Sequence, residues 1–253
     1  MTAMDAIVDA LGLPPDARVD ARVPKKLLVE QGAPTAADKR AIQDGIDELQ
    51  WLAACKPTTT GVPAFVDAVR QYLEIAVLVC AFRPGAKSAR LIELIHRAVP
   101  YPVLLITSDE DGLCVSVAHK RAAQNEADKV VIEPIVTAGG IRSEPQSPEV
   151  LAFMDSLALA KQPRLNLLTL YEGWLARIEA LNAARLSGTY SATDDAATLE
   201  RRRSALEAHY RLSKEVTGLR ARAGREKQMS RRVDLNLQIQ RIEGDLEAHK
   251  KNL

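Results

Sequence analysis

Two amphipathic helical runs at the end of the chain constrain its fold more than any other feature. Their apolar residues recur with spacings of four, three and four, at Leu212, Val216, Leu219 and Ala223 in the first run and at Leu235, Ile239, Ile242 and Leu246 in the second. This spacing is typical of a seam along which one helix packs against another. The seams therefore predict a helical part over residues 197–253, packed either on itself or on a second protein.

A single straight helix would not bring these two seams together. At 100° per residue they would lie about 140° apart around such a helix, and Gly224 stands between them. We therefore expect a break and an antiparallel helical hairpin, with one continuous helix that changes partner halfway as the alternative. Asn236 falls within the second seam, and we expect it to set the register, as a buried Asn does in coiled coils.

A cluster of bases lies where the two runs meet. The chain has 34 Lys and Arg against 33 Asp and Glu, yet residues 218–232 hold six bases and one acid, which leaves the rest of the chain near −4. That balance argues against a protein that coats nucleic acid with its whole surface. The six bases are Arg220, Arg222, Arg225, Lys227, Arg231 and Arg232.

Two interpretations of this basic cluster stay open. It is either a solvated hairpin tip, in which Arg serves helix propensity and solubility, or a surface that binds phosphates or an acidic partner. The second interpretation rests on the forked guanidinium group, which binds such groups with two hydrogen bonds.

The first 160 residues have the pattern of an α/β domain. Residues 73–82 are apolar on both faces, as a central strand requires, and Ser88 stands where a helix N-cap belongs. We expect a mixed four- to five-stranded sheet with flanking helices. The strands are predicted near residues 51–55, 73–82, 102–107, 113–119 and 129–136, the helices near 2–12, 35–49 and 88–99, and a loop over 137–148.

The rest of the chain is helical after one further candidate strand at residues 156–160. Apolar positions from Leu165 to Leu181 recur with a period of 3.6, and Gly188 ends the run. The predicted organisation is an α/β domain over 1–160, a long helix and linker over 161–196, and a helical hairpin or coiled coil over 197–253.

The composition predicts a cytoplasmic protein. No apolar run approaches the roughly 20 residues of a membrane span, and no basic segment precedes an apolar one at the N-terminus. Cys55, Cys80 and Cys114 are an odd number at wide spacing in apolar surroundings, which is typical of reduced, buried thiols.

Five short motifs in order along the chain resemble the prokaryotic domain-of-unknown-function family 4391. They are Val23-Pro24-Lys25-Lys26, Leu49-Gln50-Trp51 before a Lys-Pro-Thr loop, Pro100-Tyr101-Pro102-Val103, Leu170-Tyr171-Glu172, and Arg225-Glu226-Lys227-Gln228 followed by residues 231–236. The resemblance implies a gene neighbourhood with DNA methyltransferases and superfamily-2 helicases in defence loci, and hence an accessory subunit that works near DNA. It supplies no catalytic residues.

The residues themselves offer no catalytic constellation. A restriction-type nuclease needs two carboxylates for its metal and a nearby Lys, but Glu74 is the only acid near the central strand and no Lys lies two residues on. Asp109, Glu110 and Asp111 are expected to form a turn. The four histidines lack ligand spacing, so no metal or cofactor is predicted. Histidine 119 is expected to end a strand at the surface, and tryptophans 51 and 174 are expected to anchor the core.

These observations together favour a non-enzymatic adaptor of a bacterial DNA-targeting defence system. The terminal helices would recruit a helicase or a DNA methyltransferase, and a homo-oligomer through the same helices stays open. Two alternatives remain: a nonspecific DNA-binding protein that uses the basic cluster, and a divergent metal-dependent nuclease.

Overall fold

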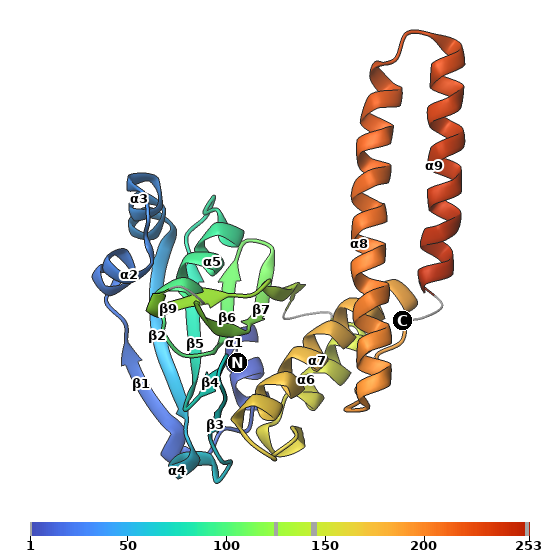
Figure 1. Ribbon diagram of the computed structural model, residues 1–253. Coiled ribbons are helices and arrows are strands. Elements are labelled where there is room, and N and C mark those ends of the chain that lie inside the picture. The colour runs from blue at the N-terminus through green and yellow to red at the C-terminus, as the bar shows by residue number, and fades with distance from the viewer. Residues whose placement is uncertain (1, 124–125, 143–145, 251–252) are drawn as a thin grey trace. The chain divides into compact units, whose positions relative to one another are not determined.

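The computed structural model describes residues 2–123, 126–142, 146–250 and 253. The chain divides into two compact units, Met1–Ile178 and Glu179–Leu253, each described here by itself. Figure 1 shows the helices and strands along the chain.

The first unit contains most of the secondary structure. Its helices are α1 (Ala3–Ala10), α2 (Lys25–Gly32), α3 (Ala36–Gly45), α4 (Pro57–Thr60), α5 (Ser88–Ala98), α6 (Pro148–Ser156), and two short 3-10 turns at Pro15–Ala17 and Leu159–Lys161. Its strands are β1 (Arg18–Arg22), β2 (Ile46–Cys55), β3 (Phe65–Val66), β4 (Gln71–Tyr72), β5 (Ile75–Phe82), β6 (Val103–Asp109), β7 (Gly112–Ala118), β8 (Lys120–Ala123), β9 (Glu126–Ile132) and β10 (Val136–Ile141). Helix α7 (Leu167–Ser187) belongs to both units, and α8 (Ala196–Arg225) and α9 (Met229–Lys250) complete the second.

A mixed sheet forms the centre of the first unit. Its strand order is β1-β2-β5-β6-β7-β10, and β5 and β6 pair in parallel while the other neighbours pair antiparallel. Helix α5 makes the crossover between the two parallel strands, as the sequence predicts. The mixed α/β class is therefore confirmed, but the sheet has six strands and not four to five.

Three differences account for the strand count. Residues 129–136 do not add a strand to the central sheet, because β9 pairs with β8 in a separate two-stranded ribbon. The sheet's last strand is instead β10, which lies in the segment expected to be a loop and pairs with β7. The first strand, β1, was not predicted either: it is short, and all five of its residues are exposed, so no buried face marks it.

Three further expectations are wrong at the level of single elements. Residues 35–49 are not one helix, because α3 ends at Gly45 and β2 begins at Ile46, whose side chain is buried in the core. Helix α2 lies in a segment for which no helix was expected. The candidate strand at residues 156–160 is absent from the described structure there, where α6 ends at Ser156 and a 3-10 turn follows.

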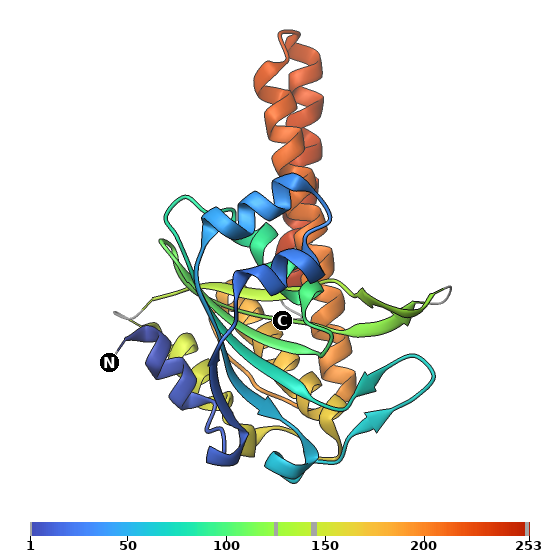
Figure 2. The same ribbon diagram turned by 90° about the vertical axis from the view of Figure 1, so that its left-hand side faces the viewer.

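One face of the sheet packs against α2, α3 and α5 (Figure 2). The contacts come from the apolar stripe of α5, including Leu91 and Ile95, which are fully buried against β5 and β6 residues such as Leu78 and Leu105. Burial of one such side chain contributes about 1.5–3 kcal/mol to folding. Gly32 permits the close contact between α2 and α5, because a Cβ there would lie 2.7 Å from the Cβ of Ala98.

The opposite face packs against α1, α6 and the first part of α7. Residues 2–4, at the start of α1, share a cavity with Val79 and Ala81 of β5. The Leu159 N–H donates to the Leu11 carbonyl at 2.8 Å, which ties the end of α1 to the turn after α6. Trp174 of α7 is fully buried and donates from Nε1 to the Leu157 carbonyl at 2.9 Å. Its predicted role as a core anchor is confirmed.

Tyr171 of α7 fastens this helix to the sheet. Its buried hydroxyl accepts a hydrogen bond from the Ala118 N–H at 2.8 Å and donates to the Val103 carbonyl at 2.8 Å. These two backbone groups lie at the paired ends of β7 and β6. One side chain therefore joins two strands and the helix that covers them.

Removal of this hydroxyl should destabilise the first unit. In Tyr171→Phe the Ala118 N–H and the Val103 carbonyl lose a buried partner, so we expect the free energy of unfolding to fall by about 1–3 kcal/mol. Urea unfolding monitored by circular dichroism measures this. Tyr210→Phe is the matched control, since Tyr210 is 75% exposed, and an equal loss in both variants would contradict the assignment.

Candidate functional site

Helices α8 and α9 pack against each other along the predicted seam. The buried cluster between them consists of Val216, Leu219, Ala223, Leu235 and Ile239, with Ile242 and Leu246 packed at its edge. Leu212 is also buried, although it lies outside this cluster. The seams thus meet each other within one chain. Any surface that binds a partner through these helices must therefore lie outside the seam.

The two helices run in opposite directions (Figure 1). Asp195 caps the start of α8, where its carboxylate accepts a hydrogen bond from the Thr198 N–H at 2.8 Å. Helix α8 continues through Gly224 and ends at Arg225, and the extended Glu226 then turns the chain toward α9. The Gln228 N–H donates to the Glu226 carboxylate at 2.8 Å, which closes the turn.

Asn236 does not have the role predicted for it. Its side chain is exposed, while Leu235 and Ile239 on either side of it in the sequence are buried. The residue lies one position past Leu235 and so points away from the seam. It therefore cannot set the register from inside the contact between the helices.

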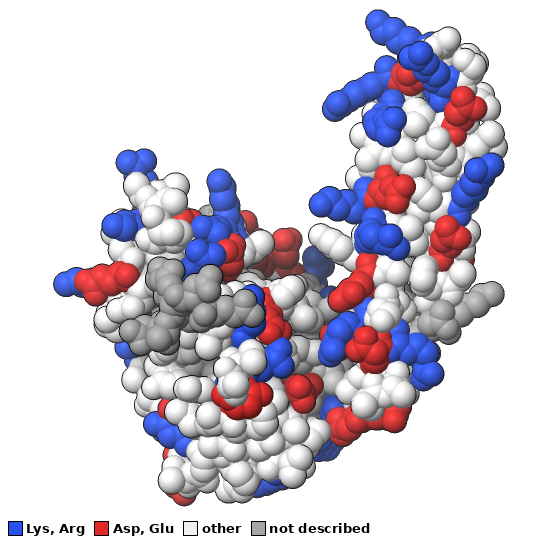
Figure 3. All heavy atoms as spheres, viewed as in Figure 1, with Lys and Arg blue, Asp and Glu red and all other residues white. Residues whose placement is uncertain are grey.

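The six bases of the cluster gather at the end of the hairpin, around the turn between α8 and α9 (Figure 3). Arg220 forms an ion pair with Glu243 across the hairpin at 2.7 Å, and both side chains are largely exposed. Arg232 donates to the Met229 sulfur at 3.1 Å. In the part of the chain that the structure describes, the other four bases have no ion pair: Arg222, Arg225, Lys227 and Arg231. We call the six together the basic tip.

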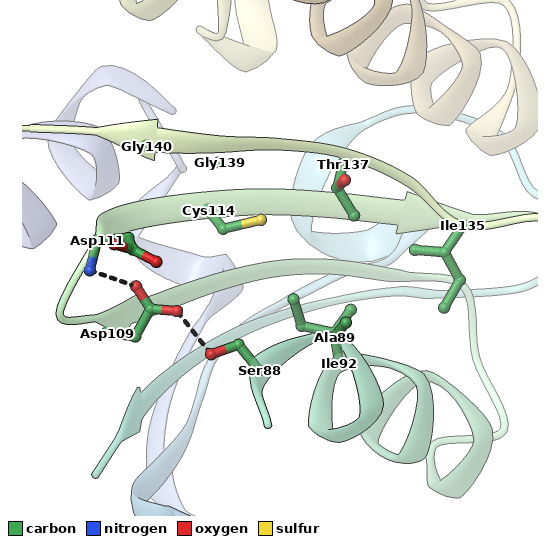
Figure 4. A pocket seen from close by; sticks show the side chains of 10 residues that line it. All are labelled: Ser88, Ala89, Ile92, Asp109, Asp111, Cys114, Ile135, Thr137, Gly139 and Gly140. Carbon is green, nitrogen blue, oxygen red and sulfur yellow. Dashed lines mark hydrogen bonds between the residues drawn. The ribbon is translucent and has the colours of Figure 1, made fainter. Parts of the chain in front are cut away.

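A cleft in the first unit is lined partly by polar groups (Figure 4). Its volume is about 410 Å³, and it lies where β6 ends beside the start of α5. Ser88 donates from Oγ to Asp109 at 2.6 Å, and the Asp111 N–H donates to the other oxygen of Asp109 at 3.0 Å. Asp109 thus stabilises the β6–β7 turn and the start of α5, in line with the predicted turn.

Glu74, the acid considered for nuclease chemistry, lies at the start of β5. Its buried carboxylate pairs with Lys56 at 3.0 Å. Among the residues with a described position, no group of three His, Cys, Asp or Glu could hold a metal ion. The environment of Glu74 is that of a structural ion pair.

The thiols are arranged as predicted for two of the three cysteines. Cys55 and Cys80 are buried and reduced, and Cys114 is half-buried beside the cleft. Burial, followed by the nearby charge of Glu74, raises the pKa of the Cys55 thiol to about 12, and burial likewise raises the pKa of Cys80. Thiols held in the protonated form are poor nucleophiles.

Tyr72, His119 and Tyr171 form a cluster in the first unit that the sequence did not predict. His119 is not a plain surface residue: its Nδ1 shares a hydrogen bond with the Tyr72 hydroxyl, and its ring centroid lies 5.5 Å from that of Tyr171. In a separate contact of the same unit, Trp51 packs edge-on against Tyr101, with 6.3 Å between the ring centroids, and its Nε1 donates to the Ala53 carbonyl. Tyr72 and Tyr171 are both far from His119 in the sequence, so spacing along the chain could not reveal the cluster around His119.

Lys120 and His96 are buried titratable groups near the end of α5. Lys120 donates from Nζ to the Val99 carbonyl, and burial lowers the pKa of its ammonium to about 7. His96 lies within hydrogen-bond distance of Ser116 at 3.0 Å, while burial, then the charge of Lys120, lowers the pKa of its imidazole to about 3. Burial therefore shifts both groups toward the neutral form in the folded protein.

The lowered pKa of Lys120 should make the free energy of unfolding depend on pH. Between about pH 7 and the unfolded pKa near 10.5, the folded chain binds fewer protons than the unfolded chain, so its stability rises with pH. Relative to Lys120→Met, the wild-type free energy of unfolding should increase by up to about 1.4 kcal/mol per pH unit in this range. Urea titrations at about pH 7 and about pH 9 test this. The exposed Lys39→Met should show a constant difference, and an equally constant difference for Lys120→Met would contradict a neutral Lys120.

Comparison with known proteins gives one match. A family model described as a domain of unknown function, number 4391, matches residues 11–246, which is nearly the whole chain. No curated protein and no solved structure matches. Within the described residues, no helix combines the length and the apolar character that a membrane crossing requires.

Proposed function

We propose, because the chain belongs to the domain-of-unknown-function family 4391, that it is a non-enzymatic accessory protein whose hairpin binds the phosphate backbone of DNA. The basic tip makes this contact. The bound chain then serves as an adaptor that holds a helicase or a DNA methyltransferase near its substrate. The observation that carries the proposal is the gathering of six bases at the tip, of which only Arg220 forms an ion pair in the described structure.

The distribution of charge supports this proposal. The second unit holds 15 Lys and Arg against 11 Asp and Glu, a net +4, and the first unit holds 19 against 22, a net −3. The positive charge is therefore concentrated in one helical element. Five of the six tip residues are Arg, whose planar fork pairs with a phosphate through two hydrogen bonds.

The packing of the hairpin explains how so many like charges can lie together. The buried seam holds α8 and α9 in fixed positions, so their repulsion does not separate the helices. The tip side chains come from two helices and a turn, so they do not form the row along one helix face that would enter a groove and read successive base edges. We therefore infer binding without strong sequence preference.

The environment of Glu74 weighs against the nuclease alternative, because its carboxylate is paired with Lys56 and belongs to no group of three potential metal ligands among the described residues. An acidic protein partner is the closer competitor, because a carboxylate-rich surface would also complement the basic tip. Salt dependence on duplex DNA separates these two partners.

The first test measures DNA binding by fluorescence anisotropy of a labelled duplex at several salt concentrations. Neutralisation of three or four phosphates predicts a log–log slope near −3. Arg225→Gln/Arg231→Gln/Arg232→Gln should stay folded, lose most of the affinity and flatten the slope. Arg201→Gln/Arg211→Gln/Lys214→Gln removes the same charge from α8 away from the tip and should bind nearly as the parent does. A parent that fails to bind at physiological salt would refute DNA binding.

The adaptor role needs a separate test with purified partners. The helicase and the methyltransferase encoded beside the gene, which the family resemblance implies, are each mixed with the tagged full chain and recovered by affinity capture. We expect one of them to be retained in the absence of DNA, and retained equally by the tip variant. Retention of neither at micromolar concentrations would overturn the adaptor role while leaving DNA binding untouched.

A further inference from the structure

Helix α9 has a second stripe on the face opposite the seam, which is apolar in its first half and uncharged throughout. Met229, Val233 and Leu237 are 63%, 49% and 48% exposed. Gln240 and Gly244 continue the stripe, so that Val233, Leu237, Gln240 and Gly244 repeat the four-three-four spacing of the seam. At 100° per residue this stripe is centred about 150° from the seam residues of α9. The hairpin interior therefore cannot cover it.

The stripe is free of charge over more than four turns. From Met229 to Gly244, every Asp, Glu, Lys and Arg of α9 lies outside the arc of about 80° that the stripe spans. Gly244 adds a second observation, because a Cβ placed there would meet no atom within 4 Å. A Gly inside a helix costs about 1 kcal/mol relative to Ala, and no packing among the described residues explains Gly244.

One edge of the stripe carries an acid and a base, so the same edge on two copies of the chain can form complementary charge pairs. Asp234 and Arg241 are both exposed, lie on this edge seven residues apart, and form no ion pair with any described residue. They are two turns, or about 10 Å, apart along the helix and cannot pair with each other. A second α9 that runs in the opposite direction brings Asp234 of each copy beside Arg241 of the other copy.

We propose that the outer face of α9 is a self-association surface that pairs two copies of this chain antiparallel. A two-fold axis between Leu237 and Gln240 places Leu237 of one copy on Gln240 of the other, and Val233 on Gly244. The same register sets Asp234 beside the second copy's Arg241, and Arg241 beside its Asp234. Both contacts repeat, as in an isologous interface.

The alternative directions and occupants fit less well. If the same stripes paired in parallel, the positions that flank the contact would be different. Asp234 would then lie beside Met229 of the second copy, and Arg241 would lie beside its Asn236. The charges then stay unpaired. A partner whose surface carries charges of one sign could form an ion pair with only Asp234 or only Arg241, whereas a second copy forms ion pairs with both.

Charge exchange in the full chain tests the pairing. Sedimentation equilibrium at low salt should show a concentration-dependent dimer for the wild type. Asp234→Arg and Arg241→Asp should each weaken it by about tenfold, because each sets two pairs of like charges together. The double variant Asp234→Arg/Arg241→Asp should restore the dimer. An equimolar mixture of the two single variants should also dimerise, since opposite charges then face each other.

Several outcomes would overturn this proposal. They are a wild-type monomer throughout the accessible concentration range, a dimer that neither single variant weakens, and single variants that neither the double variant nor the mixture rescues. Thermal unfolding confirms that each variant is folded. The variant Arg225→Gln/Arg231→Gln/Arg232→Gln should still dimerise, so a failure of self-association is distinguishable from a failure of DNA binding at the tip.

Discussion

Burial of β5 on both faces is the constraint on which the first unit depends. Residues Ile75 to Leu78 are fully buried, so each face of this strand needs a layer of helices. Helix α5 covers one face and also connects β5 to its parallel neighbour β6. Tyr171 fixes the covering helix on the other face through the backbone of β6 and β7. The remaining strands extend the sheet outward from this centre.

The elements that the sequence predicts well are those whose burial follows a simple period. The strand at residues 75–82 is apolar throughout, and α5 has a clear apolar stripe, so both are evident without tertiary information. The end of α7 is also evident, because Gly188 takes a φ of +82°. In each case the local pattern and the tertiary contacts agree.

The elements that escaped prediction depend on contacts distant in the sequence. Strand β10 contains Gly139 and Gly140 and looks like a loop, yet it pairs with β7. Ile46 continues a helical period but belongs to β2, because β5 pairs with it. At the basic tip, the sequence indicated the cluster of charges but not which of them find partners. The ion pair of Arg220 with Glu243 appears only when α9 folds back on α8.

The exposed strand β1 limits how this protein can bind others. It is an edge of the sheet, where unpaired backbone groups invite another strand to add. Its register against β2 shifts between Arg18 and Ala21, and Asp20 adopts a φ of +48°, which non-Gly residues rarely do. Arg18 and Asp20 also pair on this edge at 2.8 Å. A bent, charged edge of this kind resists strand addition, which protects this side of the sheet against polymerisation through β1.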